Sequence, residues 1–185
     1  MRIDVITLFP EIFASITDYG ISARAMKRGL WNIHFWNPRD VTEDVHRTVD
    51  DRPFGGGPGM VMMAEPLAKT LEYVRASGNS GPVIAFSPTG ERLTDAYVRS
   101  FSSQPAGQMV LVCGRYEGID ERFLETYVDH TVSLGDFVLS GAELAACALI
   151  DAVVRQLPGA IKELSASDES FSTGLLDAPH YTRPE

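Results

Sequence analysis

The N-terminal part of the chain arranges apolar and polar residues in the pattern of strands and short helices. Residues 1–9 are mostly apolar, which predicts a buried opening strand. Pro10 suits the first position of a helix, because its missing N–H would have no partner there. A short basic helix is expected between Gly20 and Gly29. Alternation of apolar and polar residues over 31–35 then predicts a half-buried strand.

Further along the chain, an apolar strand runs into a small, glycine-containing turn three times. The units are PVIAF before SPTG (87–90), QMVLVC before GRYEG (114–118) and HTVSL before GDFVLSG (135–141). Helices are expected near 94–101, near 120–127 and over 142–157. Strands that alternate with helices predict an α/β fold with a mainly parallel sheet. Ligands of such folds lie outside the carboxyl ends of the strands, so the three turns predict a ligand cradle.

Residues 38–60 show neither the periodicity of a helix nor the alternation of a strand. A loop this long in a compact domain is usually a functional loop or a disordered one. His46 with Asp50 and Asp51 is compatible with metal binding or acid–base chemistry, although the spacing alone favours Asp–Arg pairs with neighbouring arginines. The glycine run that follows fits either an anion-binding nest or a flexible turn. A helix is expected from about Glu65.

Composition places the chain among ordinary globular proteins. It has 185 residues, of which 44% are hydrophobic and 22% charged. No stretch approaches the roughly 18 consecutive apolar residues of a membrane span. Cys113 and Cys147 are far apart and lie in apolar stretches. We therefore expect buried thiols in a reducing cytoplasm, without a metal cage or a disulfide.

Net charge argues against a nucleic-acid partner. The formal charge is −9, whereas neutralisation of phosphates needs clustered Lys and Arg. The local exception is Arg24, Lys27 and Arg28, which fit either a solvated helix face or a contact with nucleic acid.

The common nucleotide and hydrolase fingerprints are missing. GGGPGM places Met60 where the last glycine of a dinucleotide loop would stand. The sequence also lacks a P-loop, H-E-x-x-H and G-x-S-x-G. This argues against dinucleotide dehydrogenases, P-loop kinases, zinc proteases and α/β-hydrolases.

The C-terminal stretch 158–185 is irregular and rich in Ser, acids and Pro, as expected of a lid or linker. On sequence alone, Arg155 is interpreted as a cation at the end of a helix. The adjacent acids Asp168 and Glu169 are interpreted as solvated side chains.

Several unusual segments nevertheless match one family in a single register over residues 1–185. They are LFPE (8–11), HRTVDDRPFGGGPGM (46–60), SPTG (87–90), LVCGRYEGIDER (111–122), GDFVLSGAEL (135–144) and GLLDAPHYTRPE (174–185). Together they closely resemble the bacterial tRNA (guanine-N1)-methyltransferases of the SPOUT superfamily, which modify guanine at tRNA position 37.

The resemblance implies an α/β fold with a SPOUT-type mainly parallel sheet, a C-terminal trefoil knot and helices on both faces. It also implies a homodimer. From the alternation alone we would expect an open, flavodoxin-like sheet, since general topology rules disfavour knots. The implied domains are a methyltransferase domain over 1–160 and an interdomain linker or lid over 161–185, with the family's C-terminal helical domain absent.

In the family, the three strand-end loops hold S-adenosylmethionine. The matching positions here are Phe86, Ser87, Pro88, Gly114, Tyr116, Glu117, Gly118, Ser133, Leu134, Gly135, Phe137, Leu139 and Gly141. Family members also respond to magnesium, for which Glu117 is the candidate ligand. The chain departs from the family pattern in GAELA, where Ala142 and Ala145 replace Gly and Pro.

The chemistry of guanine N1 explains which catalytic groups the resemblance implies. N1 carries a proton, so a base must remove it, and a cation must stabilise the charge that builds on O6. The family's arginine matches Arg155. Its aspartate matches Glu169, with Asp168 as the alternative base.

The guanine itself is expected to face the glycine-rich loop. The residues that the resemblance implies for substrate binding are His46, Asp50, Arg52, Pro58 and Gly59. The basic residues near 24–28 would assist tRNA contact, which we expect to be weak in this acidic chain.

The implied function is methyl transfer from S-adenosylmethionine to N1 of guanine 37 in tRNA. One alternative is a cofactor-binding dimer core with little or no catalysis, because the tRNA-gripping domain is missing. Another is an unrelated flavodoxin-like nucleotide binder, which would bind flavin or nucleotide and ignore S-adenosylmethionine.

Overall fold

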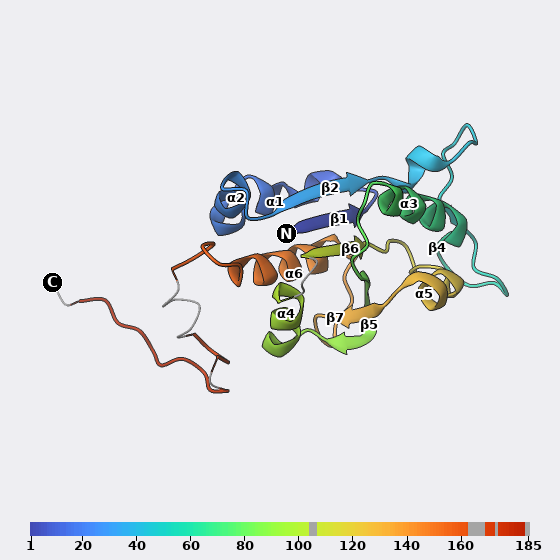
Figure 1. The fold of residues 1–185 in the computed structure, drawn as a ribbon. Coiled ribbons are helices and arrows are strands. Elements are labelled where there is room, and N and C mark those ends of the chain that lie inside the picture. The colour runs from blue at the N-terminus through green and yellow to red at the C-terminus, as the bar shows by residue number, and fades with distance from the viewer. Residues whose placement is uncertain (104–106, 163–168, 173, 184–185) are drawn as a thin grey trace.

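The computed structural model describes residues 1–103, 107–162, 169–172 and 174–183. Its centre is a five-stranded sheet in the order β2-β1-β6-β5-β7, in which every neighbouring pair is parallel (Figure 1). The strands are β1 (Arg2–Ile6), β2 (Asn32–Trp36), β5 (Val83–Arg92), β6 (Gln108–Val112) and β7 (His130–Ser133). The expected α/β fold with a mainly parallel sheet is confirmed.

The helices follow the predicted segments closely. They are η1 (Pro10–Phe13), α1 (Ala14–Thr17), α2 (Gly20–Lys27), η2 (Pro38–Val41), α3 (Ala64–Ala76), α4 (Asp95–Ser102), α5 (Glu121–Tyr127) and α6 (Glu143–Arg155). Pro10 stands at the start of η1, as the sequence predicts. The basic helix between the two glycines is α2.

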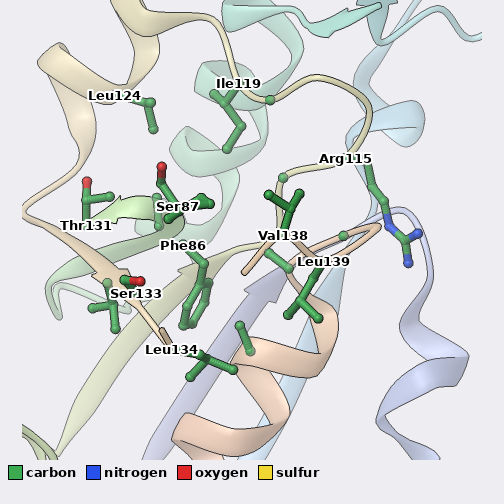
Figure 2. Close-up of a pocket in the computed structure, with 18 of the residues that line it drawn as sticks. Phe86, Ser87, Arg115, Ile119, Leu124, Thr131, Ser133, Leu134, Val138 and Leu139 are labelled. Atoms are coloured by element: carbon green, nitrogen blue, oxygen red, sulfur yellow. The ribbon is translucent and has the colours of Figure 1, made fainter. Parts of the chain in front are cut away.

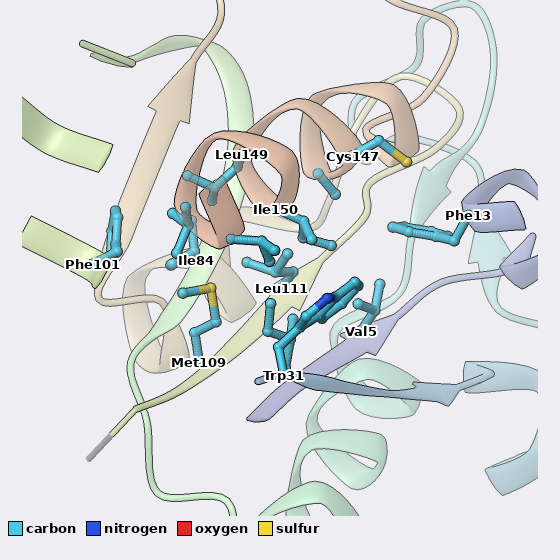
Figure 3. Close-up of a cluster of buried hydrophobic side chains, with 14 of the residues drawn as sticks. Val5, Phe13, Trp31, Ile84, Phe101, Met109, Leu111, Cys147, Leu149 and Ile150 are labelled. Atoms are coloured by element: carbon cyan, nitrogen blue, oxygen red, sulfur yellow. The ribbon is translucent and has the colours of Figure 1, made fainter. Parts of the chain in front are cut away.

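Helices cover both faces of the sheet because side chains alternate along each strand. Leu111 of β6 belongs to a buried cluster with Leu149 of α6 (Figure 3). Its neighbour Val110 belongs to a second cluster, together with Leu71 of α3 and Phe123 of α5. The arrangement with helices on both faces is therefore confirmed.

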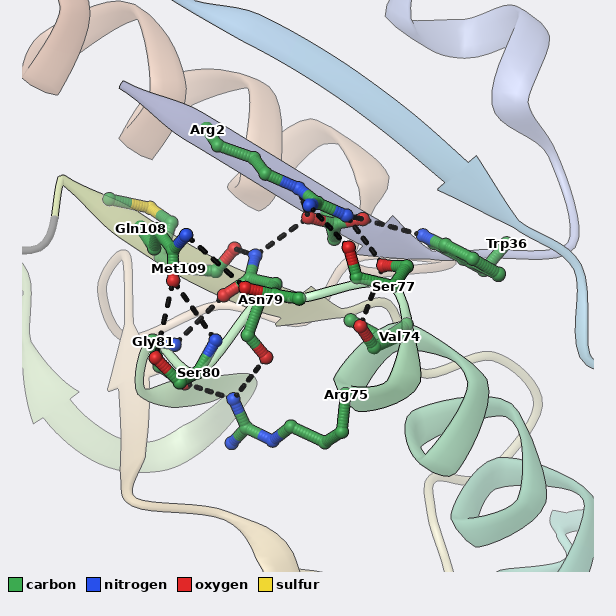
Figure 4. A network of polar contacts seen from close by, with 12 residues as sticks. Arg2, Trp36, Val74, Arg75, Ser77, Asn79, Ser80, Gly81, Gln108 and Met109 are labelled. Atoms are coloured by element: carbon green, nitrogen blue, oxygen red, sulfur yellow. Dashed lines mark hydrogen bonds and ion pairs between the residues drawn. The ribbon is translucent and has the colours of Figure 1, made fainter.

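One fully buried carboxylate fastens β1 to its surroundings (Figure 4). Asp4 accepts hydrogen bonds from Arg2 Nε at 2.7 Å, Trp36 Nε1 at 2.7 Å and Asn79 Nδ2 at 2.6 Å. Burial alone would raise the pKa of Asp4, but the hydrogen bonds from Arg2, Asn79 and Trp36 outweigh it and hold the pKa below its usual range. The network thus joins two strands to the turn after α3.

Two local expectations were wrong. SPTG (87–90) does not end its strand: β5 continues to Arg92 and pairs with β7 on both sides of a register shift between Phe86 and Glu91. Gly90 is required there, because a Cβ would lie 2.6 Å from the backbone of Thr131. The segment 38–60 also contains regular structure, namely η2 and β3 (Asp50–Asp51), which pairs antiparallel with β4 (Val61–Met62).

Both cysteines are free and buried, as expected. Burial raises the pKa of the Cys113 thiol well above its usual value and raises that of Cys147 as well. Neither thiol is therefore poised to act as a nucleophile.

Candidate functional site

The predicted cradle is a pocket of about 280 Å³ where the irregular middle of β5 and the loops after β6 and β7 meet the start of α6 (Figure 2). All thirteen residues that the resemblance assigned to cofactor binding line it: Phe86, Ser87, Pro88, Gly114, Tyr116, Glu117, Gly118, Ser133, Leu134, Gly135, Phe137, Leu139 and Gly141. Residues far apart in the sequence are thus gathered in one cavity. The carboxyl ends of parallel strands produce this gathering.

Backbone hydrogen bonds hold the pocket walls together. Ala142 N donates to Gly114 O at 3.0 Å, which fastens the start of α6 to the loop after β6. Leu93 N donates to Ser133 O at 2.8 Å, which fastens the end of β5 to β7. Ala142 and Ala145, the two departures from the family pattern, both line the pocket.

A buried charged pair lies behind this wall. Glu143, only 1% exposed, accepts hydrogen bonds from Thr7 Oγ1 at 2.9 Å and from Arg115 Nε at 3.1 Å. Arg115 also donates to Ser140 O at 3.3 Å. Gly141 leaves room for this guanidinium, because a Cβ there would lie 2.3 Å from Arg115 Nε. The pair joins β1, the loop after β6 and the loop before α6.

The ionised side chains that line the pocket disfavour a phosphate-bearing ligand. Glu117 and Glu121 line it as carboxylates, and Arg115 is its only basic lining residue among the described residues. Arg115 is paired with Glu143 at 2.9 Å, and its guanidinium lies over the Phe9 ring at 4.4 Å. Figure 2 shows this guanidinium directed away from the other labelled side chains. The pocket therefore suits a cationic ligand better than a nucleotide with several phosphates.

The glycine-rich loop packs against the same pocket. Glu117 N donates to Met60 O at 2.9 Å, and Met62 N donates to Gly118 O at 2.9 Å. A Cβ at Gly59 would lie 2.3 Å from Glu117 Oε1, so Gly59 allows the close approach of the two loops. The predicted substrate residue Gly59 is therefore next to the predicted cofactor loop.

Tyr116 links the pocket to η2 and β3 through its hydroxyl. Arg39 Nη2 donates to this hydroxyl at 3.3 Å. Burial, and next the hydrogen bond with Asp50, raise the pKa of Tyr116. The residue also adopts a left-handed backbone conformation, with φ of 60°. Such local strain is concentrated at functional sites.

The remaining predicted substrate residues are open to solvent. His46, Arg52 and Pro58 are exposed. The backbone N–H groups of His46 and Arg52 donate to Asp44 and Asp51. The expected ties between Asp50 or Asp51 and neighbouring arginines are not among the ion pairs of the described residues, where Arg47 pairs with Asp40 instead.

The predicted catalytic residues Arg155 and Glu169 form an ion pair. Arg155 Nη2 lies 2.7 Å from Glu169 Oε2, and Gln156 Nε2 donates to Oε1 at 3.0 Å. Asp168, the alternative base, lies outside the described residues. Arg155 is the last residue of α6, ten residues after Ala145 of the pocket wall and thus about 15 Å along the helix axis. The structure pairs the two groups but separates them from the pocket of their own chain.

Sequence reasoning missed several lining residues. Arg115 and Ile119 belong to the recognised segment LVCGRYEGIDER and could have been included. Leu124 and Thr131 lie on α5 and β7, and no sequence signal points to them. They reach the pocket only because of how these elements pack.

The described residues contain no group of three His, Cys, Asp or Glu side chains that could hold a metal ion. Glu117 therefore belongs to no such group of three in that part of the chain. Among the described residues, no helix is long and apolar enough to cross a membrane.

Fold and site together define an α/β protein with a pocket at the ends of its parallel strands. Residues 1–185 match the family model described as tRNA (Guanine-1)-methyltransferase TrmD. The chain belongs to this family, and its relatives are named as enzymes.

Curated relatives support this assignment over the whole chain. A tRNA (guanine-N(1)-)-methyltransferase of Thiobacillus denitrificans is 60% identical over 190 residues, covering 100% of this chain and 80% of the relative. One from Pseudomonas putida is 58% identical, covering 100% of this chain and 74% of the relative. The crystal structure of tRNA (m1G37) methyltransferase from Aquifex aeolicus matches with a TM-score of 0.82 and 38% identity, over 100% of this chain and 76% of that one.

Proposed function

We propose that this protein transfers the methyl group of S-adenosylmethionine to N1 of guanine 37 in tRNA. The observation that carries the proposal is the gathering of all thirteen expected cofactor residues around one pocket. The name of the Aquifex aeolicus neighbour, a tRNA (m1G37) methyltransferase, supports the choice of nucleotide.

The pocket fits S-adenosylmethionine in size and charge. Its volume of about 280 Å³ is just below the roughly 300–1,000 Å³ of small-molecule sites. Glycines 114, 118 and 135 leave backbone groups accessible to a ligand, and Glu117 and Glu121 complement a positive charge. When bound, S-adenosylmethionine supplies a methyl group that is already activated by its sulfonium.

The catalytic roles follow from the ion pair at the end of α6. In our proposal Glu169 accepts the N1 proton of guanine, which makes N1 a nucleophile. Arg155 then stabilises the negative charge that builds on O6. Their separation of 2.7 Å supports a joint role, because both groups must reach one edge of the same base.

The separation of this pair from the pocket supports a homodimer. On α6, Leu144 is 57% exposed, and Ala148, one turn later on the same face, is exposed as well. An exposed apolar face of this kind is typical of an interface between copies. We infer that α6 packs against its counterpart, so that Arg155 and Glu169 of one chain meet the pocket of the other.

We propose that the target guanine binds against the glycine-rich loop. Gly59 lies beside Glu117 of the pocket, and Asp50 contacts Tyr116. His46 and Arg52 are exposed and so remain available to RNA.

The finer organisation follows from the same proposal. We assign 1–160 to a SPOUT methyltransferase domain with a trefoil knot and 161–185 to a linker or lid. A tRNA substrate and two free thiols support a cytoplasmic location. Magnesium, with Glu117 as its ligand, stays a prediction.

Methyl transfer to defined transcripts tests the proposal. The protein is incubated with labelled S-adenosylmethionine and a tRNA that carries guanine 37, with an adenine 37 transcript as the control. We expect 1-methylguanosine at position 37 and no transfer to the control. S-adenosylmethionine binding without transfer would favour the cofactor-binding core, and preferential binding of FMN or NAD would favour the flavodoxin-like alternative.

A further inference from the structure

We propose that Arg99 of α4 is a positioning residue that holds the carboxylate of Glu169 beside Arg155. The inference rests on the proposed function, in which Glu169 is the base. It adds a residue from a helix that carries none of the predicted site residues.

The Glu169 carboxylate contacts residues of two helices. Its side chain is 18% exposed, and its carboxylate meets Arg155 and Gln156 at the end of α6. Arg99 Nη2 approaches Oε1 from α4 at 3.8 Å. The carboxylate therefore lies between the two helices, with a guanidinium on each side.

Arg99 is itself oriented toward this contact. Its Nε donates to Asp95 at 2.7 Å, one turn earlier on α4. Its Nη2 is buried and has no hydrogen-bond partner among the described residues. A buried donor without a partner is costly, and the nearby Glu169 carboxylate is the group that a small movement would bring within bonding distance. Arg99 thus draws the carboxylate inward.

The length of Glu169 explains why a second cation matters in this chain. The family pattern has aspartate at this position, and glutamate is one methylene longer with one more rotatable bond. A longer side chain loses more conformational freedom when it is held in one geometry. Arg99 supplies the extra contact that restrains it.

Hydrogen bonds between Ser172 and Glu169 stabilise the turn that carries Glu169. Ser172 Oγ donates to Glu169 O at 2.7 Å, and Ser172 N donates to the same oxygen at 3.1 Å. The Glu169 carboxylate is bonded to α6 and approached by α4, so its contacts link this turn to the domain. Loss of Arg99 should loosen both the carboxylate and the turn.

A double-mutant cycle tests the coupling. Methyl transfer to guanine 37 tRNA is measured for Arg99→Ala, Glu169→Asp and the double variant. With Glu169, Arg99→Ala should lower kcat roughly fivefold and leave KM for tRNA unchanged, because only the base is displaced. With Glu169→Asp, the same change should cost less than about twofold, because the shorter side chain does not reach Arg99.

Two further measurements separate positioning from a structural role. Hydrogen exchange of residues 169–172 should speed up in Arg99→Ala, and Arg99→Lys should restore part of kcat. Lys69→Ala removes an exposed ion pair with Glu43 at 3.1 Å and serves as the control, with kcat and exchange unchanged.

Equal losses of kcat from Arg99→Ala in both backgrounds, or no loss in either, would overturn the inference. Its failure can be told apart from that of the proposed function. If Glu169→Ala retains full activity, the base assignment fails; if Glu169→Ala is inactive and Arg99→Ala is normal, only the inference fails.

Discussion

The pocket and the Glu169 region are held together in different ways. Main-chain hydrogen bonds between strand ends form the pocket walls, as in the bonds from Ala142 to Gly114 and from Leu93 to Ser133. Glu169 is held by side-chain contacts with Arg155, Gln156 and Arg99. The sheet therefore builds the proposed cofactor pocket into the fold, while the proposed base is held by a few polar side chains.

Removal of the proposed base should have the largest effect, and it should lower methyl transfer without weakening cofactor binding. We predict that Glu169→Ala lowers methyl transfer about 10²–10⁴-fold, the range typical of a general base. Affinity for S-adenosylmethionine should not change, because Glu169 is not a lining residue of the pocket and in our proposal meets the guanine rather than the cofactor. Single-turnover transfer and calorimetry measure the two quantities. Glu169→Gln, which keeps the shape without the charge, should be as inactive as Glu169→Ala.

Breaking the buried hydrogen-bond network around Asp4 should lower the stability of the whole fold, without a specific effect on the pocket or on the Glu169 region. Asp4→Ala leaves Arg2, Trp36 and Asn79 without their shared acceptor, so we predict a loss of about 3 kcal/mol in the free energy of unfolding. Denaturant unfolding measures it. The folded fraction should bind S-adenosylmethionine normally, and weakened binding would contradict the separation of network and pocket.

The same network predicts a pH dependence. The pKa of Asp4 is lower in the folded protein than in the unfolded chain, so its contribution is fully present above the unfolded value of about 3.9. It is lost as pH falls through the lower folded pKa. The stability difference between the natural protein and Asp4→Asn should therefore be constant near neutral pH and narrow below about pH 4. A difference that widened on acidification would contradict this.

A single added methyl group at Gly90 should weaken cofactor binding to the pocket, with a smaller effect than the changes above. In Gly90→Ala the new Cβ would lie 2.6 Å from the Thr131 backbone, which pushes β5 away from β7 beside the pocket. We predict about tenfold weaker binding of S-adenosylmethionine by calorimetry. Gly81→Ala is a matched control, since its Cβ would lie 2.3 Å from Gln108 O at the opposite end of the sheet. It should lower stability without changing affinity, and equal losses of affinity would argue against a local effect.

The parts of the molecule that follow local sequence patterns could be predicted. Apolar strands followed by glycine turns indicated the parallel sheet and the cradle, and the cofactor residues that the family motifs named all line one pocket. The bulge at 87–90 was missed because pairing with β7, rather than local propensity, continues β5 past Ser87. Residues 38–60 looked irregular because β3 has only two residues.

Long-range side-chain contacts were beyond prediction. The sequence analysis assigned no role to Glu143, which is 1% exposed and pairs with Arg115. Arg99 lies on α4, a helix that the sequence predicted without any role for its residues. Its approach to Glu169 joins residues 70 positions apart, which no local pattern encodes.

A mixing experiment tests the central claim that one chain's Arg155 and Glu169 serve the pocket of another. Ala145→Phe is chosen to fill the pocket, and calorimetry first verifies that it no longer binds S-adenosylmethionine. Co-expression of this chain with Glu169→Ala pairs an intact pocket with an intact base in each mixed dimer. We predict that methyl transfer recovers to about a quarter of the natural level, although each variant is inactive alone. No recovery in a verified mixed dimer would contradict the account.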